Sequence, residues 1–222
     1  MSGVTLVCFA VSQEAKAFRH WARGRKDIEI VVTGMGARNA ERAIRTAFEE
    51  FSPAQVFTCG FAGALNPALC IGDVVFDQSA TAPRTITRLI AFGIIPVTFH
   101  CSKIVAVTAA AKAQLLQETG ADAVEMESQI IQKACAVRKV PCVTLRAISD
   151  MAAEDLPLDF NTLLDDEEHL SRSKLTRAIL RAPHKIPALI RLGRNSAYAA
   201  RELSAALVAL LEPESGNATF LR

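Results

Sequence analysis

The sequence of 222 residues has no paired cysteines and no cluster of residues with the spacing of a metal site. Its cysteines occur singly, mostly in apolar runs, with no CxxC pair and no neighbouring histidines at zinc spacing. They are Cys8, Cys59, Cys70, Cys101, Cys135 and Cys142. We interpret them as small buried side chains of a protein in a reducing compartment. This pattern predicts neither a disulfide scaffold nor a metal or cofactor.

Long hydrophobic runs are also missing, although half of the residues are apolar. No apolar run reaches the length that crosses a bilayer, and the N-terminus lacks the basic and apolar regions of a signal peptide. The net charge of +2 does not indicate a protein that binds polyanions. We therefore expect a soluble, cytoplasmic protein without a nucleic-acid partner.

Acidic residues are absent from residues 169–201. The basic residues of this segment are Arg172, Lys174, Arg177, Arg181, Lys185, Arg191, Arg194 and Arg201. Pro183 and Pro187 divide it into two predicted helices, and Ile186, Leu189, Ile190 and Leu192 lie among the charges. Two interpretations stay open: a helix in peripheral contact with an anionic membrane, or a solvated helix packed on the domain.

The rest of the chain alternates short apolar runs with helical patterns. Predicted strands cover residues 4–10, 28–33, 55–60, 72–76, 103–108 and 141–149, and predicted helices cover 12–22, 37–51, 111–119 and about 126–138. Strands that are apolar on both faces indicate a mostly parallel sheet covered by helices, in the α/β class. We predict one domain over residues 1–211 and a frayed tail over 212–222.

Polar or glycine-rich segments follow several of these strands, at residues 12–14, 34–36, 60–63 and 149–150. In parallel sheets the ligand site lies beyond the carboxyl ends of the strands, so these segments are expected to meet at one crevice. Asp150 ends the apolar run VTLRAISD, where it either performs chemistry or caps a following helix.

The segment AVEMES at residues 123–128 carries two carboxylates, Glu125 and Glu127. They share one face on a strand but not once a helix has begun, so we expect only one of them to face a ligand. The alternative is that both stabilise the first turn of a helix, where negative charge is favourable.

In their order along the chain, several motifs resemble the nucleoside phosphorylases and nucleosidases that cleave the N-glycosidic bond of purine nucleosides. They are SQEA at 12–15, TGMG at 33–36, CGFAGAL at 59–65 with GDVV at 72–75, VEMES at 124–128 and RAISD at 146–150. The resemblance implies a nucleoside phosphorylase-like fold, a single-domain three-layer α/β/α arrangement around a central mixed, mostly parallel sheet. It also implies a homodimer and no cofactor.

The resemblance implies roles for five side chains. Asp150 is similar to the general acid that protonates purine N7, with Ser149 orienting it. Glu127 matches the residue that binds the ribose 2′- and 3′-hydroxyls, and Met126 the residue that packs along the sugar. Glu14 matches the glutamate that activates water in the hydrolytic branch, methylthioadenosine/adenosylhomocysteine nucleosidase. Because the phosphorolytic branch has an arginine there, Glu14 favours hydrolysis.

The predicted substrate-binding set is completed by the glycine segments, at Gly36, Gly60, Phe61, Ala62 and Gly63. Phe61 stands where many relatives have a serine that contacts phosphate or water. The segment between Val107 and Lys112 is shorter than in the nucleosidases, which leaves the base specificity open. A phosphate-dependent phosphorylase and a catalytically weak nucleoside-binding protein therefore stay as alternatives.

A subgroup resemblance rests on KAQLLQETGADAVEMES and on HKIPALIRLGRNS in the basic segment. Both stretches are similar to the hopanoid-associated phosphorylase-like proteins, whose proposed substrate is adenosylhopane. The resemblance implies a small-molecule substrate that is a 5′-substituted adenosine, with adenine as the released base.

Overall fold

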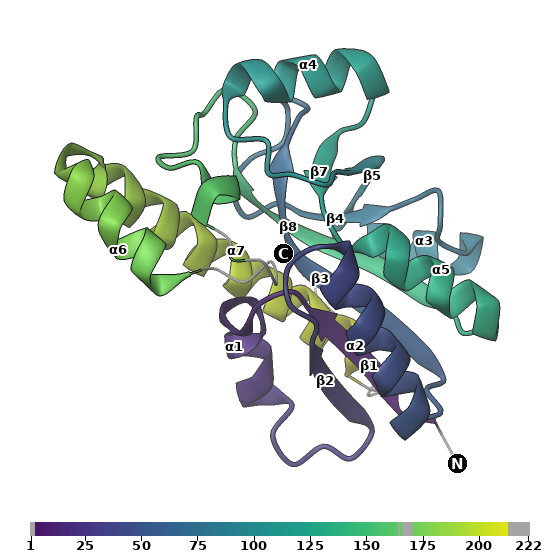
Figure 1. The fold of residues 1–222 in the computed structure, drawn as a ribbon. Coiled ribbons are helices and arrows are strands. Elements are labelled where there is room, and N and C mark those ends of the chain that lie inside the picture. Colours follow the sequence, from purple (N-terminus) through teal and green to yellow (C-terminus); the bar gives the residue numbers. More distant parts are fainter. Residues whose placement is uncertain (1–2, 164, 166–170, 213–222) are drawn as a thin grey trace.

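The computed structural model describes residues 3–163, 165 and 171–212, and over these residues the chain forms one eight-stranded mixed sheet (Figure 1). The strands are β1 (Thr5–Phe9), β2 (Ile28–Val32), β3 (Gln55–Ala64), β4 (Val74–Asp77), β5 (Ile95–Val97), β6 (Phe99–Cys101), β7 (Ala123–Glu125) and β8 (Cys142–Asp150). Their main order is β2-β1-β3-β8-β4-β5, and β7 joins β3 to β6. The pairs β4–β8 and β3–β7 are antiparallel and the others are parallel, which confirms a mixed, mostly parallel sheet.

Helices cover both faces of this sheet. They are α1 (Ser12–Trp21), α2 (Ala37–Glu50), α3 (Pro83–Ala91), α4 (Ala109–Thr119), α5 (Ser128–Arg138), α6 (Arg172–Arg181) and α7 (Ile186–Leu211), with short 3₁₀ turns at Phe160–Leu163 and Pro183–Lys185. Side chains of β1 alternate between the faces: Val7 and Phe9 pack with α1 and α7, whereas Leu6 and Cys8 pack with α2 and α5. The predicted three-layer α/β/α fold is confirmed.

One predicted strand is wrong. Residues 103–108 form no strand, although their apolar pattern resembles one. The backbone N–H and C=O of Val105 bond instead to the side chain of Asn161, and Ala106 packs with Leu65 and Val124. The sheet positions in this part of the chain belong to β6 and β7, three-residue strands that the sequence patterns did not indicate.

The interpretation of the cysteines as buried side chains holds for three of the six and is wrong for Cys70, and Cys101 and Cys142 are half-buried. All six are free, and Cys8, Cys59 and Cys135 are buried, whereas Cys70 is exposed. Cys70 lies in the turn before β4, where its N–H donates to Asp73 Oδ2 over 2.8 Å. Because the turn is closed by this polar contact at the surface, its apolar sequence neighbours do not bury the thiol.

β3 and β8 bring the predicted motifs together. They run parallel, and a register shift between Ala62 and Gly63 places Gly63 opposite Asp150. β3 is longer than expected, because it continues through the glycine-rich stretch to Ala64. The central strand therefore carries its glycines to the edge where the carboxylates lie.

The two helices expected in the basic segment are present as α6 and α7. Pro183 and Pro187 fall at helix starts, where a proline without an N–H is tolerated. Figure 1 shows α6 and the first part of α7 projecting from one side of the molecule. Among the described residues, none of the helices combines the length and apolar composition required to cross a membrane. The predicted frayed tail, apart from Glu212, lies outside the described residues.

Candidate active site

A cavity of about 220 Å³ opens where β1, β3 and β8 end. Eight of the ten predicted site residues line it: Glu14, Phe61, Ala62, Gly63, Met126, Glu127, Ser149 and Asp150. Gly36 and Gly60 are not among the lining residues, but both contact the carboxylates that are. The three acidic groups singled out in the sequence thus share one cavity.

Glu14 belongs to the first turn of α1 and is 5% exposed. Its Oε2 accepts the Val11 N–H at 3.0 Å and its Oε1 accepts the Phe61 N–H at 2.9 Å, so the carboxylate is fixed by the residue before α1 and by β3. Burial raises the pKa of Glu14 above its ordinary value, although both hydrogen bonds and the nearby Arg146 act to lower it. A Cβ on Gly60 would lie only 2.8 Å from Oε1, so the glycine leaves room for this carboxylate.

Glu127 stands at the junction of β7 and α5 and is 9% exposed. Its Oε1 accepts the N–H of Gly36 at 2.9 Å, and Gly36 adopts a positive φ of 81° just before α2. Burial, and then the negative charge of Glu125, raise the pKa of Glu127 to about 7. The glycine turn at 34–36 therefore holds a carboxylate of this chain.

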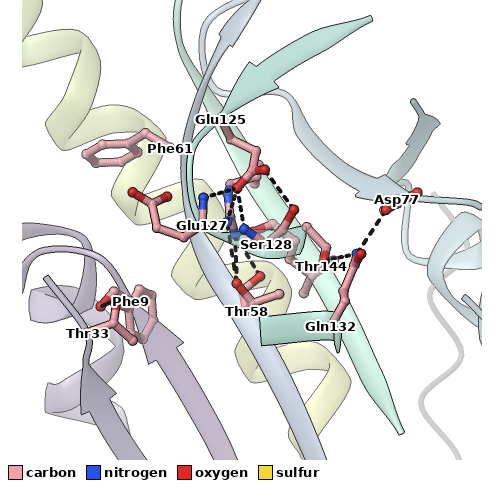
Figure 2. A network of polar contacts seen from close by, with 12 residues as sticks. Phe9, Thr33, Thr58, Phe61, Asp77, Glu125, Glu127, Ser128, Gln132 and Thr144 are labelled. Atoms are coloured by element: carbon pink, nitrogen blue, oxygen red, sulfur yellow. Dashed lines mark hydrogen bonds and ion pairs between the residues drawn. The ribbon is translucent and has the colours of Figure 1, made fainter. Parts of the chain in front are cut away.

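Glu125 and Arg146 form a buried ion pair beside the cavity, with Arg146 Nη2 at 2.7 Å from Glu125 Oε2. Glu125 also accepts the backbone N–H groups of Glu127 and Ser128 and the Ser128 hydroxyl. Burial alone would raise its pKa, but Arg146 and these donors hold the pKa below its usual value. Both glutamates line the cavity, but in Figure 2 the Glu127 carboxylate points away from the network that occupies Glu125. That only Glu127 meets a ligand stays a prediction.

Arg146 was missed by sequence reasoning, although an arginine inside the buried run VTLRAIS is a detectable signal. Its Nη1 donates to the carbonyl oxygens of Thr58 and Leu145. Its Nε is the one buried side-chain nitrogen or oxygen without a hydrogen-bond partner among the residues that the structure describes. The guanidinium is therefore anchored on β3 and β8 while its charge acts on the surrounding carboxylates.

Asp150 ends β8, and no helix follows it, so the helix-capping alternative is wrong. Its Oδ1 accepts the Ser149 hydroxyl at 2.8 Å, the orienting contact expected of Ser149. Its Oδ2 accepts from Lys112 Nζ at 2.5 Å. The register shift brings Gly63 so close that a Cβ there would lie 3.0 Å from Oδ2.

Lys112 is the second residue that sequence reasoning missed. It lies in α4 and is completely buried. Lys112, Leu115, Leu116 and Thr119 have the spacing of one helix face, so a lysine on an otherwise mostly apolar stripe was the available signal. Its burial indicates a function that a surface lysine would not require.

The remaining wall of the cavity is largely apolar, with Met35, Ile104, Val105, Leu156 and Met126 among its lining residues. Ile104 lines the cavity and is nevertheless 64% exposed. The carboxylates thus lie at the polar end of a site whose opening is apolar.

Phe61 lines this cavity and also a second one of about 1160 Å³ between α1 and α7. Lys16, Arg19, Arg23 and Arg201 are among the residues around the second cavity. The aromatic side chain, at the place where a serine was expected from the resemblance, therefore belongs to the wall between the two spaces.

Chemically, the site offers two carboxylates able to take up protons, a third held by a serine and a lysine, and a buried cation. Among the described residues, no group of three or more His, Cys, Asp or Glu side chains could hold a metal ion. The arrangement suits acid-base chemistry on a small polar molecule.

A mixed α/β/α sheet with a cavity at its strand ends is the arrangement typical of α/β proteins that bind small molecules. Residues 6–89 and 90–182 match the sequence profile of the Phosphorylase superfamily. The chain belongs to the phosphorylase superfamily, which confirms the family expected from its motifs.

A curated relative is the 5′-methylthioadenosine/S-adenosylhomocysteine nucleosidase of Staphylococcus aureus, which is 28% identical over 198 residues. The match covers 70% of this chain and 82% of the relative.

Solved structures share the fold at lower identity. Futalosine hydrolase of Helicobacter pylori superposes with a TM-score of 0.72 at 16% identity, covering 95% of this chain and 98% of that one. The 5′-methylthioadenosine/S-adenosylhomocysteine nucleosidase of the same organism, bound to butyl-thio-DADMe-Immucillin-A, has a TM-score of 0.71, equal identity and the same coverage. The finer likeness to the hopanoid-associated subgroup stays a prediction.

Proposed function

We propose that the protein hydrolyses the N-glycosidic bond of a 5′-substituted adenosine and releases adenine. Asp150 protonates N7 of the departing base, Glu127 binds the ribose hydroxyls and Glu14 takes a proton from the attacking water. Ser149 orients Asp150, and Met126 packs along the sugar. The nucleosidase relatives support this reaction class.

The observation that carries the proposal is the presence of Glu14, Glu127 and Asp150 around one cavity. Glu14 also supports water as the nucleophile. Its carboxylate is buried and fixed by two N–H donors, so it cannot swing away to admit a phosphate ion. A buried carboxylate repels an anion at close range, whereas a water molecule can donate to it.

The test is incubation of the purified protein with methylthioadenosine, adenosylhomocysteine, inosine and an adenosine that carries an apolar 5′ group, each with and without phosphate. We expect adenine and a free sugar from the 5′-substituted adenosines, at rates that phosphate does not change. A sugar 1-phosphate formed only with phosphate would establish the phosphorylase alternative. Binding without turnover of any nucleoside would establish the accessory-protein alternative.

We further propose that the 5′ substituent is a bulky apolar group such as a hopanoid. The apolar rim supports this, because Ile104 stays mostly exposed although it lines the cavity. An apolar substituent that covered Ile104 and Val105 would be stabilised by about 25 cal/mol for each Å² of apolar surface removed from water. The KM values of two of these substrates test this: the adenosine with an apolar 5′ group should have a lower KM than methylthioadenosine.

We also propose a peripheral membrane contact through α6 and α7, because a substrate with a hopanoid substituent would lie in a membrane. Among their described side chains, Lys174, Arg177, Arg181, Arg191 and Arg194 are exposed. The apolar residues Leu180, Ile186 and Ile190 are 76%, 40% and 52% exposed on the same two helices. Exposed cations with exposed apolar side chains suit the surface of an anionic bilayer in a cytoplasmic protein.

A homodimer is proposed as the working assembly. The exposed residue Ile104 supports it, since a second copy placed beside the opening would bury part of this side chain and leave the cavity accessible. Sedimentation velocity at micromolar concentration should give twice the chain mass of 23.9 kDa. Replacement of Ile104 by Asp should shift the species toward monomer, whereas Val137→Asp, at a residue that is 82% exposed on α5, should not.

A further inference from the structure

Lys112 occupies a site built for a protonated amine. Its side chain is 1% exposed, and Nζ lies 2.5 Å from Asp150 Oδ2, 2.8 Å from the Met151 carbonyl oxygen and 3.0 Å from the Glu154 carbonyl oxygen. An ammonium group has three N–H donors, and here each has one acceptor. Without these partners, burial of the charge would cost several kcal/mol. The ammonium is therefore completely satisfied inside the protein.

The same geometry also satisfies the neutral amine. If the proton between Nζ and Oδ2 moves to Asp150, the two remaining N–H groups still donate to Met151 and Glu154. The lone pair of the amine then accepts the new O–H of Asp150. Both arrangements of this proton thus leave the N–H groups of Lys112 with acceptors while the heavy atoms keep their positions. A surface lysine, which bonds to water, would not be held in such an arrangement.

We propose that Lys112 supplies the proton that Asp150 donates to the departing base. This inference rests on the proposed function and deepens it. Lys112 touches Asp150 and not the substrate, so it is a positioning residue that acts through the carboxyl group. It explains how a carboxylate paired with a cation can nevertheless deliver a proton to the purine.

One Nζ–H bond of Lys112 breaks and an O–H bond forms on Asp150. The new O–H then turns from Nζ towards the cavity. As the bond between C1′ and N9 breaks, its electron pair enters the purine and this proton passes to N7. Water bonds to C1′ through its oxygen and loses a proton to Glu14. Asp150 is again a carboxylate, Lys112 is a neutral amine and Glu14 is protonated, and exchange with solvent after product release moves one proton back.

The competing explanation is that Lys112 only holds Asp150 in place by its charge. Arginine separates the two, because a guanidinium keeps a positive charge and several donors but does not give up a proton in proteins. Lys112→Arg retains an ion pair with Asp150 and removes the proton supply. Lys112→Met removes both and preserves most of the side-chain volume.

The experiment measures single-turnover release of adenine with the enzyme in excess over methylthioadenosine. Rates are normalised to the fraction of each protein that binds adenine, so that partial unfolding lowers the concentration and not the rate. We expect both Lys112 variants to lose about 100-fold or more in rate and to bind adenine within about threefold of the wild type. Lys133→Met, at an exposed lysine of α5, serves as the matched control and should keep the wild-type rate.

Chemical rescue provides the second readout. In Lys112→Ala, ethylammonium carries a transferable proton into the vacated space, whereas guanidinium carries only charge. We expect acceleration by the amine alone. Equal acceleration by both cations, or a Lys112→Arg rate within about tenfold of the wild type, would overturn the proton-supply role. If the wild type itself releases no adenine from any nucleoside, the proposed function fails, and that result is distinct from loss of the Lys112 effect.

Discussion

At the scale of single residues, the site depends on carboxylates whose surroundings differ although all are buried. Glu125 is neutralised by Arg146, Asp150 is paired with Lys112, and Glu14 and Glu127 have only backbone N–H donors among the hydrogen bonds found. Differences of this kind separate the acid, base and binding roles of side chains that are chemically alike.

Glu14→Gln tests the base. The amide keeps the shape of the side chain but cannot take a proton from water, so we expect kcat to fall by about 10²- to 10⁴-fold with little change in KM. Steady-state release of adenine measures this. Glu41→Gln, at an exposed glutamate of α2, is the control and should be fully active. Full activity of Glu14→Gln would assign water activation to another group.

Glu127 should lower stability at alkaline pH. Its pKa in the folded protein is about 7, above the ordinary 4.5, so its favourable contribution is complete below pH 4.5 and is lost as the pH rises through 7. Glu127→Gln cannot ionise and should raise the melting temperature at pH 8 more than at pH 5, by a free energy on the order of 1 to 3 kcal/mol. Activity should fall in the same variant, since the ribose loses a carboxylate acceptor.

Glu125→Gln is the matched comparison, with the opposite sign. The pKa of Glu125 is lowered, so its contribution to stability is present above pH 4.5 and is lost in acid. This variant should therefore melt at a lower temperature than the wild type at pH 8, with a smaller difference near pH 4. Equal shifts for the two variants at both pH values would contradict the assignment of the two environments.

Arg146→Met should be strongly destabilising. It leaves Glu125 buried without its cation, and removal of one partner of a buried pair costs about 3 to 5 kcal/mol. Thermal or urea unfolding measures the loss. The double variant Arg146→Met with Glu125→Gln should recover part of it, because no uncompensated charge remains. A double variant as unstable as the sum of the single ones would show that the pair does not interact.

At the scale of elements, β3 determines where the functional groups lie. Gly60 of this strand lies beside the Glu14 carboxylate, and the N–H of Phe61 donates to the same carboxylate. Gly63 is paired with Asp150. The two glycines are required because side chains there would enter the space of the carboxylates.

Gly60→Ala tests this requirement. Its Cβ would lie 2.8 Å from Glu14 Oε1, so the carboxylate must move. A displacement of about 1 Å in a catalytic group is worth about 100-fold in rate, and we expect a loss of that order in kcat. Gly193→Ala in α7 is the control: its Cβ meets nothing within 4 Å, and the helix should gain about 0.5 to 1 kcal/mol without loss of activity.

The long elements were predictable from sequence because a continuous pattern determines them. β1, α1, β2, α2 and β8 appear where apolar periodicity placed them, and the family motifs brought Glu14, Glu127 and Asp150 to one site. β5, β6 and β7 have three residues each, too few for a periodic signal, and they depend on pairing with distant strands. Lys112 and Arg146 were missed for a related reason, since burial of a charge depends on partners far along the chain.

At the scale of the whole molecule, the charge is unevenly distributed. The net charge is only +2, yet α6 and the first part of α7 are basic and project from the body (Figure 1). A local field of this kind acts within about 10 Å at moderate ionic strength. The small net charge therefore does not describe the surface that a membrane would meet.

Liposome co-sedimentation tests the membrane proposal. We expect binding to vesicles with anionic lipid at low salt, little binding to neutral vesicles, and release near 1 M salt, where the screening length is about 3 Å. The triple variant that combines Arg181→Gln, Arg191→Gln and Arg194→Gln should lose binding, because each cation contributes about 1 kcal/mol to the free energy of membrane binding. Lys26→Gln, at an exposed lysine between α1 and β2, should not. Failure to bind anionic vesicles at low salt would remove the proposal.

The small volume of the carboxylate cavity has a practical consequence. At about 220 Å³ it lies below the roughly 300 to 1,000 Å³ of pockets that enclose a drug-sized ligand. In the proposed binding mode the purine and the ribose enter this cavity, and the large 5′ substituent extends past Ile104. The protein would then cleave the nucleoside while its apolar substituent stays in the bilayer, so the substrate would not have to be extracted from the membrane.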